Sequence, residues 1–561
     1  MESTEEEALL AGIRETPDDD APRLVYADWL EENGQAERGQ YIRLQCQANQ
    51  LAEGSSERDD AEDQTGKLFA AHAHDWMAEV PEILDSTITE RGFWTWVTAD
   101  VNIYLDFIKN HSLIPFAPTQ KLQLYNPGKH FKKLLDSPEL RWVTELNIEN
   151  CKVTEAKARA IVKCPHLQTL KSLRIQSGEL KTKGVLALLG SDGLPSLEKF
   201  SMSLGELGDD GMSKLANEPG LARLKYLDLG TSEFGSDGIA ELVRSPHLHK
   251  LDTLNLTGLN YYDQYANIND MAMEALAKTR DLPNVRSLQL WDLEVQPKYW
   301  KQFAQSPLAD QLKVLDLGQG GNSSEVGALF SGKFTNLETL ELSVMDLTPD
   351  DIKALVKSKW IRKLKRLNLD IRGEQEAETL RQLIKSPQLG KLQELQIGWE
   401  HTATGMLDIL TETKAFSKIR ELTLFGNNIT TQQISAFAKS KFAPKLVMLN
   451  LYNNPIGDDG FKALGTTPFA DSLRELAVGS CDITSDGIDW LASSNCFPRL
   501  RKLHMFGNSL KEKGLKHILK SPVFDSLCCL SFDEEDFKSS QTARLRKKFG
   551  PRLYLLTMYD Y

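Results

Sequence analysis

The stretch LVMLNLYNNPIGDDGFKALGTTPFADS, residues 446–472, contains one complete unit of the pattern that decides the fold. Leu449 and Leu451 alternate with residues of other kinds, and this period of two predicts a short strand. A polar turn follows, and Asp458 and Asp459 then stand at the place where a helix N-terminus favours acidic side chains. The unit therefore predicts one strand, one turn and one helix.

This unit repeats along most of the chain with a period of 27 residues. Eleven of the fifteen intervals between copies of the template LxxLxL are 27 residues long, three lie between 25 and 28, and one is 34. So regular a spacing indicates a repeat array and not a series of separate globular domains. The first apolar position of the sixteen copies falls at Val143, Leu170, Leu197, Leu224, Leu251, Val285, Leu312, Leu337, Leu364, Leu392, Ile419, Leu446, Leu473, Leu500, Leu527 and Leu553.

Stacking one strand and one helix per unit predicts a curved molecule. Neighbouring strands lie about 4.8 Å apart, whereas packed helices need roughly 8 to 10 Å. The strands are therefore expected to form a parallel sheet on a concave face, and the helices to form the convex face. We predict an α/β solenoid of horseshoe shape.

The ninth position of the unit, counted from its first apolar residue, has a recurrent identity. It holds Cys151, Asn427, Asn454, Cys481 and Asn508 in copies that are far apart in the sequence. An inward side chain there can form hydrogen bonds with the turn backbone, which would otherwise be buried without partners. We interpret this position, including its two cysteines, as structural.

The template LxxLxLxx(N/C)x(I/L), with a helix in every unit, resembles the ribonuclease-inhibitor-like class of leucine-rich repeats. The resemblance covers about three quarters of the chain. It implies a leucine-rich-repeat solenoid, and members of that class mostly act by binding proteins. The resemblance does not identify the partner.

The N-terminal region lacks the repeat and is expected to form a small helical module over residues 1–85. We predict helices at Thr4 to Arg14, Pro22 to Glu32 and Arg38 to Leu51, with the run Asp18 to Asp20 as a cap for the second helix. The polar residues from Gly54 to Gly66 favour a surface loop, with some helix as an alternative.

The string TPDDDAPRLVYADWLEENG resembles the small repeat-companion domain that precedes leucine-rich repeats in some bacterial proteins. The likeness continues through RGFWTWVTADV at Arg91 to Val101 and KLQLYN at Lys121 to Asn126, so residues 86–142 are interpreted as degenerate first repeats. Residues 143–561 then form the array. We interpret the module as a cap that shields the apolar edge of the first repeats.

Composition limits the function classes. The formal net charge of −13 argues against nucleic acid and anionic membranes as partners and favours a protein with a basic or a neutral surface. The N-terminus has no secretory signal pattern, and no run approaches a membrane span. Seven cysteines without a CxxC pair fit reduced thiols. We expect a cytoplasmic monomer without a cofactor.

Candidates for chemistry are weak. His72 and His74 stand two residues apart, so on a helix they point to different faces and do not form a metal pair. Cys528 and Cys529 are better explained as side chains packed within the last strands than as nucleophiles. No GxxxxGK[ST], HExxH or GxSxG string occurs. The sequence favours a non-enzymatic scaffold for protein–protein interaction.

A ligand surface can be located from the register, because positions three, five and seven of each strand project from the concave face. Position five is polar through the middle copies and includes Asp316 and Glu341; a merely solvated sheet is the alternative. Positions seven and eight carry aromatic side chains, which either bind a partner or pack on one another. These aromatic residues are Trp291, Trp399, Phe425, Tyr452 and Phe506.

The long interval supplies a second candidate surface. Its extra residues fall near Asn260 to Tyr265 and include Tyr261 and Tyr262, whose side chains suit recognition. The alternative function is an enzyme or an enzyme regulator with a site in the N-terminal module, for example a hydrolase inhibitor or a protein similar to a ubiquitin ligase. A deep polar pocket in residues 1–120 would favour that alternative.

Overall fold

The computed structural model describes residues 3–52, 55–78, 83, 89–112, 118, 120–177, 179–257, 268–291, 293–318, 326–343, 347–369, 376–398, 406–410, 418–440 and 445–556. The chain forms two compact units. The first consists of Met1–Ile148, Arg474–Gly479 and Ile483–Tyr561, and the second of Glu149–Leu473 and Ser480–Asp482. The first unit therefore combines both ends of the chain.

Eighteen strands belong to a parallel sheet that is not closed. Every one of the sixteen predicted copies carries one of them, and the two segments interpreted as degenerate first repeats carry the other two. The strands of the first unit are β3 (Trp96–Asp100), β4 (Gln120–Tyr125), β5 (Val143–Glu149), β19 (Glu475–Ala477), β20 (Lys502–His504), β21 (Cys529–Asp533) and β22 (Leu553–Leu556). Those of the second unit are β6 (Ser172–Gln176), β7 (Lys199–Ser203), β8 (Tyr226–Asp228), β9 (Thr253–Leu256), β11 (Ser287–Leu290), β13 (Val314–Asp316), β14 (Thr339–Leu342), β15 (Arg366–Leu369), β16 (Glu394–Ile397), β17 (Glu421–Thr423) and β18 (Met448–Asn450).

The pairing confirms the predicted register except in the last copy. Leu288 pairs with Leu315, and Leu315 with Leu340, so position four aligns from copy to copy. Leu530, which is also a position-four residue, pairs with Leu553. Leu553 is therefore the fourth residue of its copy, and the prediction that it is the first was wrong, because the chain before it is shorter than in the other copies.

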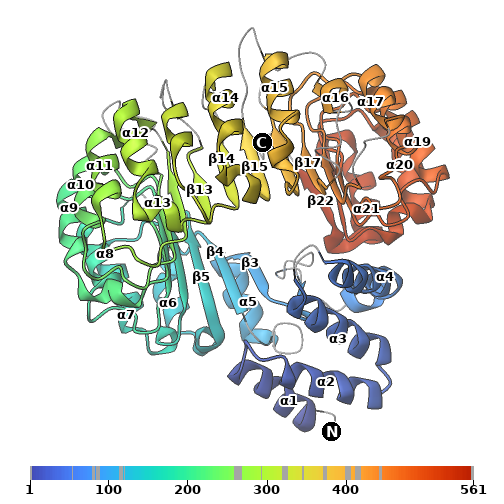
Figure 1. Cartoon of the computed structure of the whole chain (residues 1–561). Helices are drawn as coiled ribbons and strands as arrows, with labels where there is room; N and C mark the ends of the chain where they lie inside the picture. Colours follow the sequence, from blue (N-terminus) through green and yellow to red (C-terminus); the bar gives the residue numbers. More distant parts are fainter. Residues whose placement is uncertain are drawn as a thin grey trace. The chain divides into compact units, whose positions relative to one another are not determined.

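Helices connect most of these strands, as predicted. In the second unit they lie on the outer side of the strands (Figure 1). The connection after β13 instead contains the 3-10 helix η5 (Val326–Ser331). The α-helices between or after strands are α5 (Val101–Asn110), α6 (Phe131–Leu135), α7 (Glu155–Lys163), α8 (Thr182–Leu189), α9 (Gly208–Ala216), α10 (Ser236–Leu242), α11 (Asp270–Lys278), α12 (Pro297–Ala304), α13 (Pro307–Gln311), α14 (Pro349–Lys357), α15 (Glu376–Ile384), α16 (Met406–Leu410), α17 (Thr431–Ala438), α18 (Gly457–Leu464), α19 (Ser485–Ser493), α20 (Lys511–Lys520) and α21 (Ser539–Phe549).

Several short elements accompany this pattern. β1 (Thr89–Glu90) pairs antiparallel with β2 (Phe93–Trp94), and β10 (Ile268–Asn269) pairs parallel with β12 (Leu293–Glu294). Prolines begin many of the 3-10 helices because proline needs no backbone N–H at a first helical position. The 3-10 helices are η1 (Gly128–His130), η2 (Pro138–Trp142), η3 (Pro165–Leu167), η4 (Pro219–Arg223), η6 (Trp360–Lys363), η7 (Pro387–Leu389), η8 (Pro522–Ser526), η9 (Glu534–Asp536) and η10 (Gly550–Arg552).

The asparagines of position nine hold the turns together, which confirms their structural interpretation. Asn454 is fully buried, and its Nδ2 donates to the carbonyls of Leu424 and Leu451 at 2.7 and 2.8 Å. Its Oδ1 accepts from the backbone N–H groups of Asn427 and Ile429, both at 2.9 Å. One side chain thus supplies partners for backbone groups of two consecutive copies.

Equivalent positions repeat this arrangement. Asn508 Nδ2 donates to the carbonyls of Val478 and Met505, and Cys481 Sγ donates to the carbonyl of Leu451 at 3.0 Å. The residue just before, at position eight, has a positive φ in many copies. These residues are Asn150, Leu204, Thr231, Gly426, Asn453, Ser480 and Gly507.

The N-terminal helices confirm three of the predicted segments. They are α1 (Ser3–Glu15), α2 (Ala21–Glu32) and α3 (Ala36–Gln50). Their buried side chains form a core cluster with Phe93 of β2. The cap of α2 comes from Asp19, whose Oδ1 accepts from Ala21 N at 2.9 Å, whereas Asp20 makes an ion pair with Arg91.

A fourth helix, α4 (Ser56–Ala78), occupies the segment for which the sequence favoured a loop. The loop prediction was wrong for residues 56–66, because most of the polar residues there are exposed or ion-paired positions of a long helix. Its other side buries Ala61, Thr65 and Phe69. Tyr41 of α3 packs against Phe69 and Trp76, with ring centroids at 6.1 and 5.1 Å.

Replacing Asn454 tests whether the position-nine side chains stabilise the turns. The variant Asn454→Ala leaves two carbonyls and two backbone N–H groups without their buried partner, so the free energy of unfolding is expected to fall by about 3 kcal/mol. Urea unfolding measures the loss. The control Asn217→Ala removes an exposed asparagine that bonds only within its own helix end, and it should leave the midpoint within about 0.5 kcal/mol of the parent. Equal losses of stability in the two variants would contradict the role of Asn454 in holding the turns together.

Candidate protein-binding surface

Position five forms a continuous column on the strands of the second unit. The pairing places Gln289 beside Asp316, Asp316 beside Glu341, Glu341 beside Asn368, and Asn368 beside Gln396. Asp228 and Asn255 occupy the same position on β8 and β9. The register therefore confirms that these polar side chains share one row of the sheet.

Part of this column serves the local backbone. The side-chain oxygens of Asp228, Asn255, Asp316 and Asn450 each accept from the backbone N–H two residues later, at 2.8 to 3.0 Å. A short acidic or amide side chain is suited to this bond, because it closes a turn at the strand end. The polarity of these members is thus partly structural and is not by itself evidence of a ligand.

Two carboxylates of the column are partly desolvated. Burial raises the pKa of Asp316, although the Gly318 N–H and the Trp291 indole, which donates to Asp316 Oδ1 at 3.3 Å, lower it in part. Burial also raises the pKa of Glu341; Asn368 donates to its Oε2 at 3.2 Å and the nearby charge of Asp316 adds to the rise. A cationic group of a partner would offset both desolvation and repulsion here.

The aromatic candidates are half-buried in the described part of the chain. Phe425 and Tyr452 stack with ring centroids 4.9 Å apart and an interplanar angle of 14°. Each ring therefore covers one face of the other, as the packing alternative expected, and leaves part of its surface exposed. Phe506 follows β20 in the first unit and is also half-buried. Trp399, Tyr261 and Tyr262 lie outside the described residues.

A hydroxyl, an imidazole and a carboxylate meet on the strands of the first unit, and the sequence analysis missed them. Ser531 Oγ lies 3.0 Å from His504 Nδ1, and His504 Nε2 lies 3.8 Å from Glu475 Oε1. These are the group types of a hydrolase triad. Ser531, however, is only 3% exposed, so its hydroxyl is not presented to a substrate. Burial lowers the pKa of His504, which favours a neutral ring in a strand-face hydrogen-bond network.

A signal for this network was present in the sequence. His504 and Ser531 both occupy position five and are separated by 27 residues. The residues at position five of the two copies before the last one therefore predict that the two side chains lie side by side. Their pairing on β20 and β21 follows directly.

Three of the seven thiols, those of Cys46, Cys481 and Cys528, are poor nucleophiles. Burial raises the pKa of Cys46 and of Cys481 to about 12 and also raises that of Cys528, so these thiols are protonated at neutral pH. Cys528 Sγ donates to the carbonyl of Arg501 at 3.3 Å, and Cys529 is buried in β21. This agrees with the interpretation of both residues as filling of the last strands.

His72 stacks on Trp76 with ring centroids 5.3 Å apart, so its ring has a packing role. Among the described residues, no group of three or more His, Cys, Asp or Glu side chains is arranged to hold a metal ion. Within the same part of the chain, no helix combines the length and apolar character that crossing a membrane requires.

Comparisons with known proteins agree with the repeat. Residues 193–216 and 471–492 match the family model described as Leucine Rich repeat. Solved structures similar to this chain include the yeast Rad7–Elc1 complex, at 18% identity and a TM-score of 0.40, covering 63% of this chain and 84% of that chain. An internalin (inlF) from Listeria monocytogenes has 17% identity and a TM-score of 0.34, with 62% and 88% covered. No curated protein matches. The chain thus contains leucine-rich repeats.

The raised pKa of Glu341 leads to a prediction about pH. A carboxyl whose folded pKa lies above its unfolded value destabilises the fold when ionised, and this cost disappears as pH falls below the unfolded value. The variant Glu341→Gln is therefore expected to raise the urea midpoint at pH 7, with a smaller difference near pH 4. The exposed Asp192→Asn serves as control and should show no such trend. A Glu341→Gln protein less stable than the parent at pH 7 would refute this assignment.

Proposed function

We propose that this protein is a non-enzymatic scaffold that binds a protein partner on the strand face of its repeats. The observation that carries the proposal is the Phe425–Tyr452 stack, which leaves part of both aromatic rings exposed at the end of two neighbouring strands. Aromatic side chains held in place by packing lose little entropy on binding, and they are enriched at interface hot spots. Phe506, Trp291 and Trp399 stand at position seven or eight of their copies, as Phe425 and Tyr452 do. Tyr261 and Tyr262 supply the second candidate surface.

The proposed partner carries basic residues. Asp316 and Glu341 stand in adjacent strands, and both pay a desolvation cost that a lysine or arginine of a partner would relieve. The formal charge of −13 would accelerate encounter with such a partner at low salt. The proposal includes a ribonuclease-inhibitor-like repeat, a bacterial repeat-companion module at the N-terminus, a cytoplasmic location and a monomer.

The second candidate function is an enzyme or enzyme regulator. The Glu475–His504–Ser531 network is the observation that favours chemistry most, since it holds the three group types of a triad. Its buried hydroxyl argues for a structural role. The variant Ser531→Ala should therefore leave partner binding unchanged.

The binding prediction concerns three aromatic residues. The triple variant Phe425→Ala, Tyr452→Ala and Phe506→Ala is expected to lose several kcal/mol of binding free energy, at about 2 kcal/mol for each hot-spot residue. Affinity capture with the parent protein identifies the partner, and calorimetry with the purified partner measures the loss. Circular dichroism should be unchanged.

The matched control is Met271→Ala, which removes an exposed apolar side chain from helix α11 and should leave the affinity unchanged. Parent affinity in the folded triple variant would move the site to the segment of Tyr261 and Tyr262 or to the N-terminal module.

A further inference from the structure

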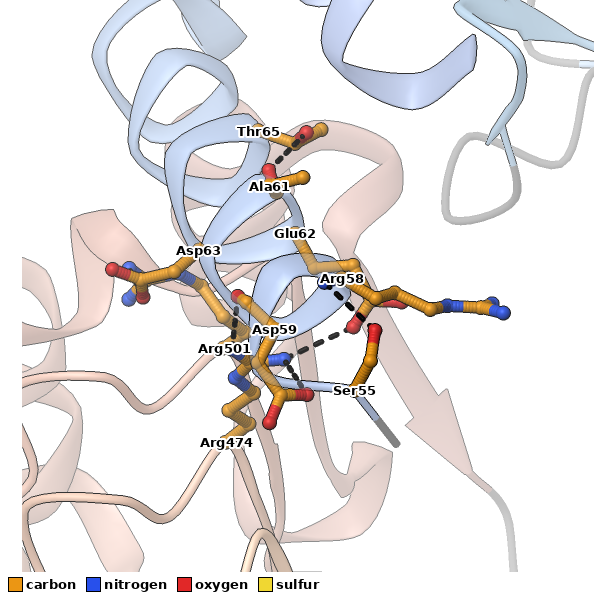
Figure 2. Close-up of polar contacts among 9 residues, drawn as sticks. All are labelled: Ser55, Arg58, Asp59, Ala61, Glu62, Asp63, Thr65, Arg474 and Arg501. Atoms are coloured by element: carbon orange, nitrogen blue, oxygen red, sulfur yellow. Dashed lines mark hydrogen bonds and ion pairs between the residues drawn. The ribbon is translucent and has the colours of Figure 1, made fainter. Parts of the chain in front are cut away.

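Helix α4 contacts two arginines that lie more than 400 residues later in the chain. Arg474 Nη1 donates to Glu62 Oε2 at 3.0 Å and lies 3.6 Å from Asp59 Oδ1, and Arg474 Nη2 donates to the backbone carbonyl of Asp59. Arg501 Nη2 donates to Asp63 Oδ1 at 3.4 Å. Figure 2 shows the acidic side chains of α4 directed at both guanidinium groups.

These contacts use one stripe of the helix. Asp59, Glu62, Asp63 and Gly66 stand at i, i+3, i+4 and i+7, which places them on the same face. The side chains of Arg501 and Asp63 are 13% and 7% exposed, so this pair is largely desolvated. Arg474 is 14% exposed, but its carboxylate partners Asp59 and Glu62 are 23% and 42% exposed. Surface ion pairs contribute little, but a buried charge without its partner is strongly unfavourable.

Gly66 shows that helix and arginine fit closely. A Cβ atom at this position would lie 2.6 Å from Arg501 Nε and 3.1 Å from its Cδ. Glycine weakens the interior of a helix, and here it lets the Arg501 side chain lie against the helix backbone. Arg501 Nε is buried without a hydrogen-bond partner among the described residues, as expected for an atom facing this surface.

The repeats explain why these arginines need an external partner. Arg474 and Arg501 both occupy position two of their copies. In earlier copies a position-two lysine pairs with a position-two glutamate one copy before it, as Lys225 does with Glu198 at 2.9 Å and Lys365 with Glu338 at 2.8 Å.

The same row contains no acid beside the two arginines. The position-two residues around them are Val447 one copy before Arg474 and Cys528 one copy after Arg501. Two adjacent guanidinium groups repel each other, and burial together with this repulsion lowers the pKa of Arg501 while Asp63 opposes the change. The carboxylates that face these arginines come from α4, where Glu62 also pairs with Arg58 and Asp63 with Lys67, both at 2.8 Å.

We propose that the position-two arginines form an acceptor site for an acidic amphipathic helix, which α4 occupies within the same chain. A partner helix with carboxylates at i, i+3 and i+4 and a small residue at i+7 fits the same site. Such a helix competes with α4, so α4 acts as an intrachain inhibitor of that second binding surface. The residues of this acceptor site differ from the aromatic candidates of the strand face.

The halves of α4 have different anchors. Displacement of its acidic half breaks the ion pairs and exposes Ala61 and Thr65, but it leaves the aromatic contacts of the other half in place. Its C-terminal half is held in the N-terminal module by the contacts of Phe69 and Trp76 with Tyr41. Its N-terminal half contains the three carboxylates that face the arginines. Exchange of ion pairs at the site therefore requires no unpacking of the aromatic contacts.

The test uses the full-length protein and a fluorescent peptide with the sequence of residues 55–78. In the variant Asp59→Lys, Asp63→Lys, amide hydrogen exchange over residues 56–66 is expected to rise at least about tenfold over the parent. This variant should bind the peptide, whereas the parent should not. Its affinity is expected to fall about tenfold or more as salt rises from about 50 to about 300 mM.

Two further variants isolate the site. Arg474→Glu, Arg501→Glu should show the same increase in exchange without peptide binding, and combining all four substitutions should restore protection because the ion pairs are re-formed with reversed sign. The matched control Glu57→Lys, Asp60→Lys changes the same charge on α4 outside the stripe and should behave as the parent.

Gly66→Ala provides an independent readout without a charge change. It should increase exchange over residues 56–66, although alanine favours a helix, whereas Gly12→Ala in α1 meets only an ordinary contact at 3.9 Å and should not. The proposal is overturned if the Asp59→Lys, Asp63→Lys variant keeps parent protection, if it is opened but does not bind the peptide, or if the parent binds the peptide equally well.

Discussion

The structure depends on the hydrogen bonds that each strand end makes as the chain turns toward its helix. Turn backbone that is buried between copies needs partners, and Asn454 provides four of them across two consecutive copies. In the copies that carry Asn427, Asn454, Cys481 and Asn508, these bonds link one turn to the preceding one and so help to set the distance between their strands. The left-handed residue at position eight belongs to the same geometry, since it directs the chain so that position nine points inward.

The sequence predicted the repeats well and the N-terminal segment less well, for a physical reason. Apolar residues at a fixed period report burial directly, so all sixteen strands could be located from leucine spacing. Leu553 was placed in the wrong register because the unit before it is shortened, and spacing alone does not reveal which apolar residue is first. Helix α4 was taken for a loop because its polar residues are the partners of distant arginines, and no local pattern reports a contact across more than 400 residues.

For the candidate protein-binding surface, too, the sequence predicted positions better than roles. The register of position five could be predicted, but the use of each side chain could not, because a carboxylate that closes a turn and one that awaits a ligand look alike in sequence. Asp316 closes a turn by accepting from Gly318 N, and its burial still raises its pKa. Glu341 has a longer side chain that does not make this bond and instead accepts from Asn368 of the next strand. Phe425 and Tyr452 likewise pack on each other and still leave exposed aromatic surface.

The distribution of charges along the second position of the copies explains where α4 binds. The chain is acidic overall, yet the second position of its copies contains several cations. Some of them have an acidic residue at the same position one copy away, as Lys225 has in Glu198 at 2.9 Å. Where two arginines follow each other, the row cannot neutralise itself, and an acidic helix from elsewhere in the chain supplies the charge. Two adjacent cations without an acidic neighbour in their row, such as Arg474 and Arg501, are therefore a signal of a docking position, because buried like charges one copy apart are unfavourable until an opposite charge is brought to them. Comparing each repeat position with its neighbours one copy away would reveal such sites from sequence alone.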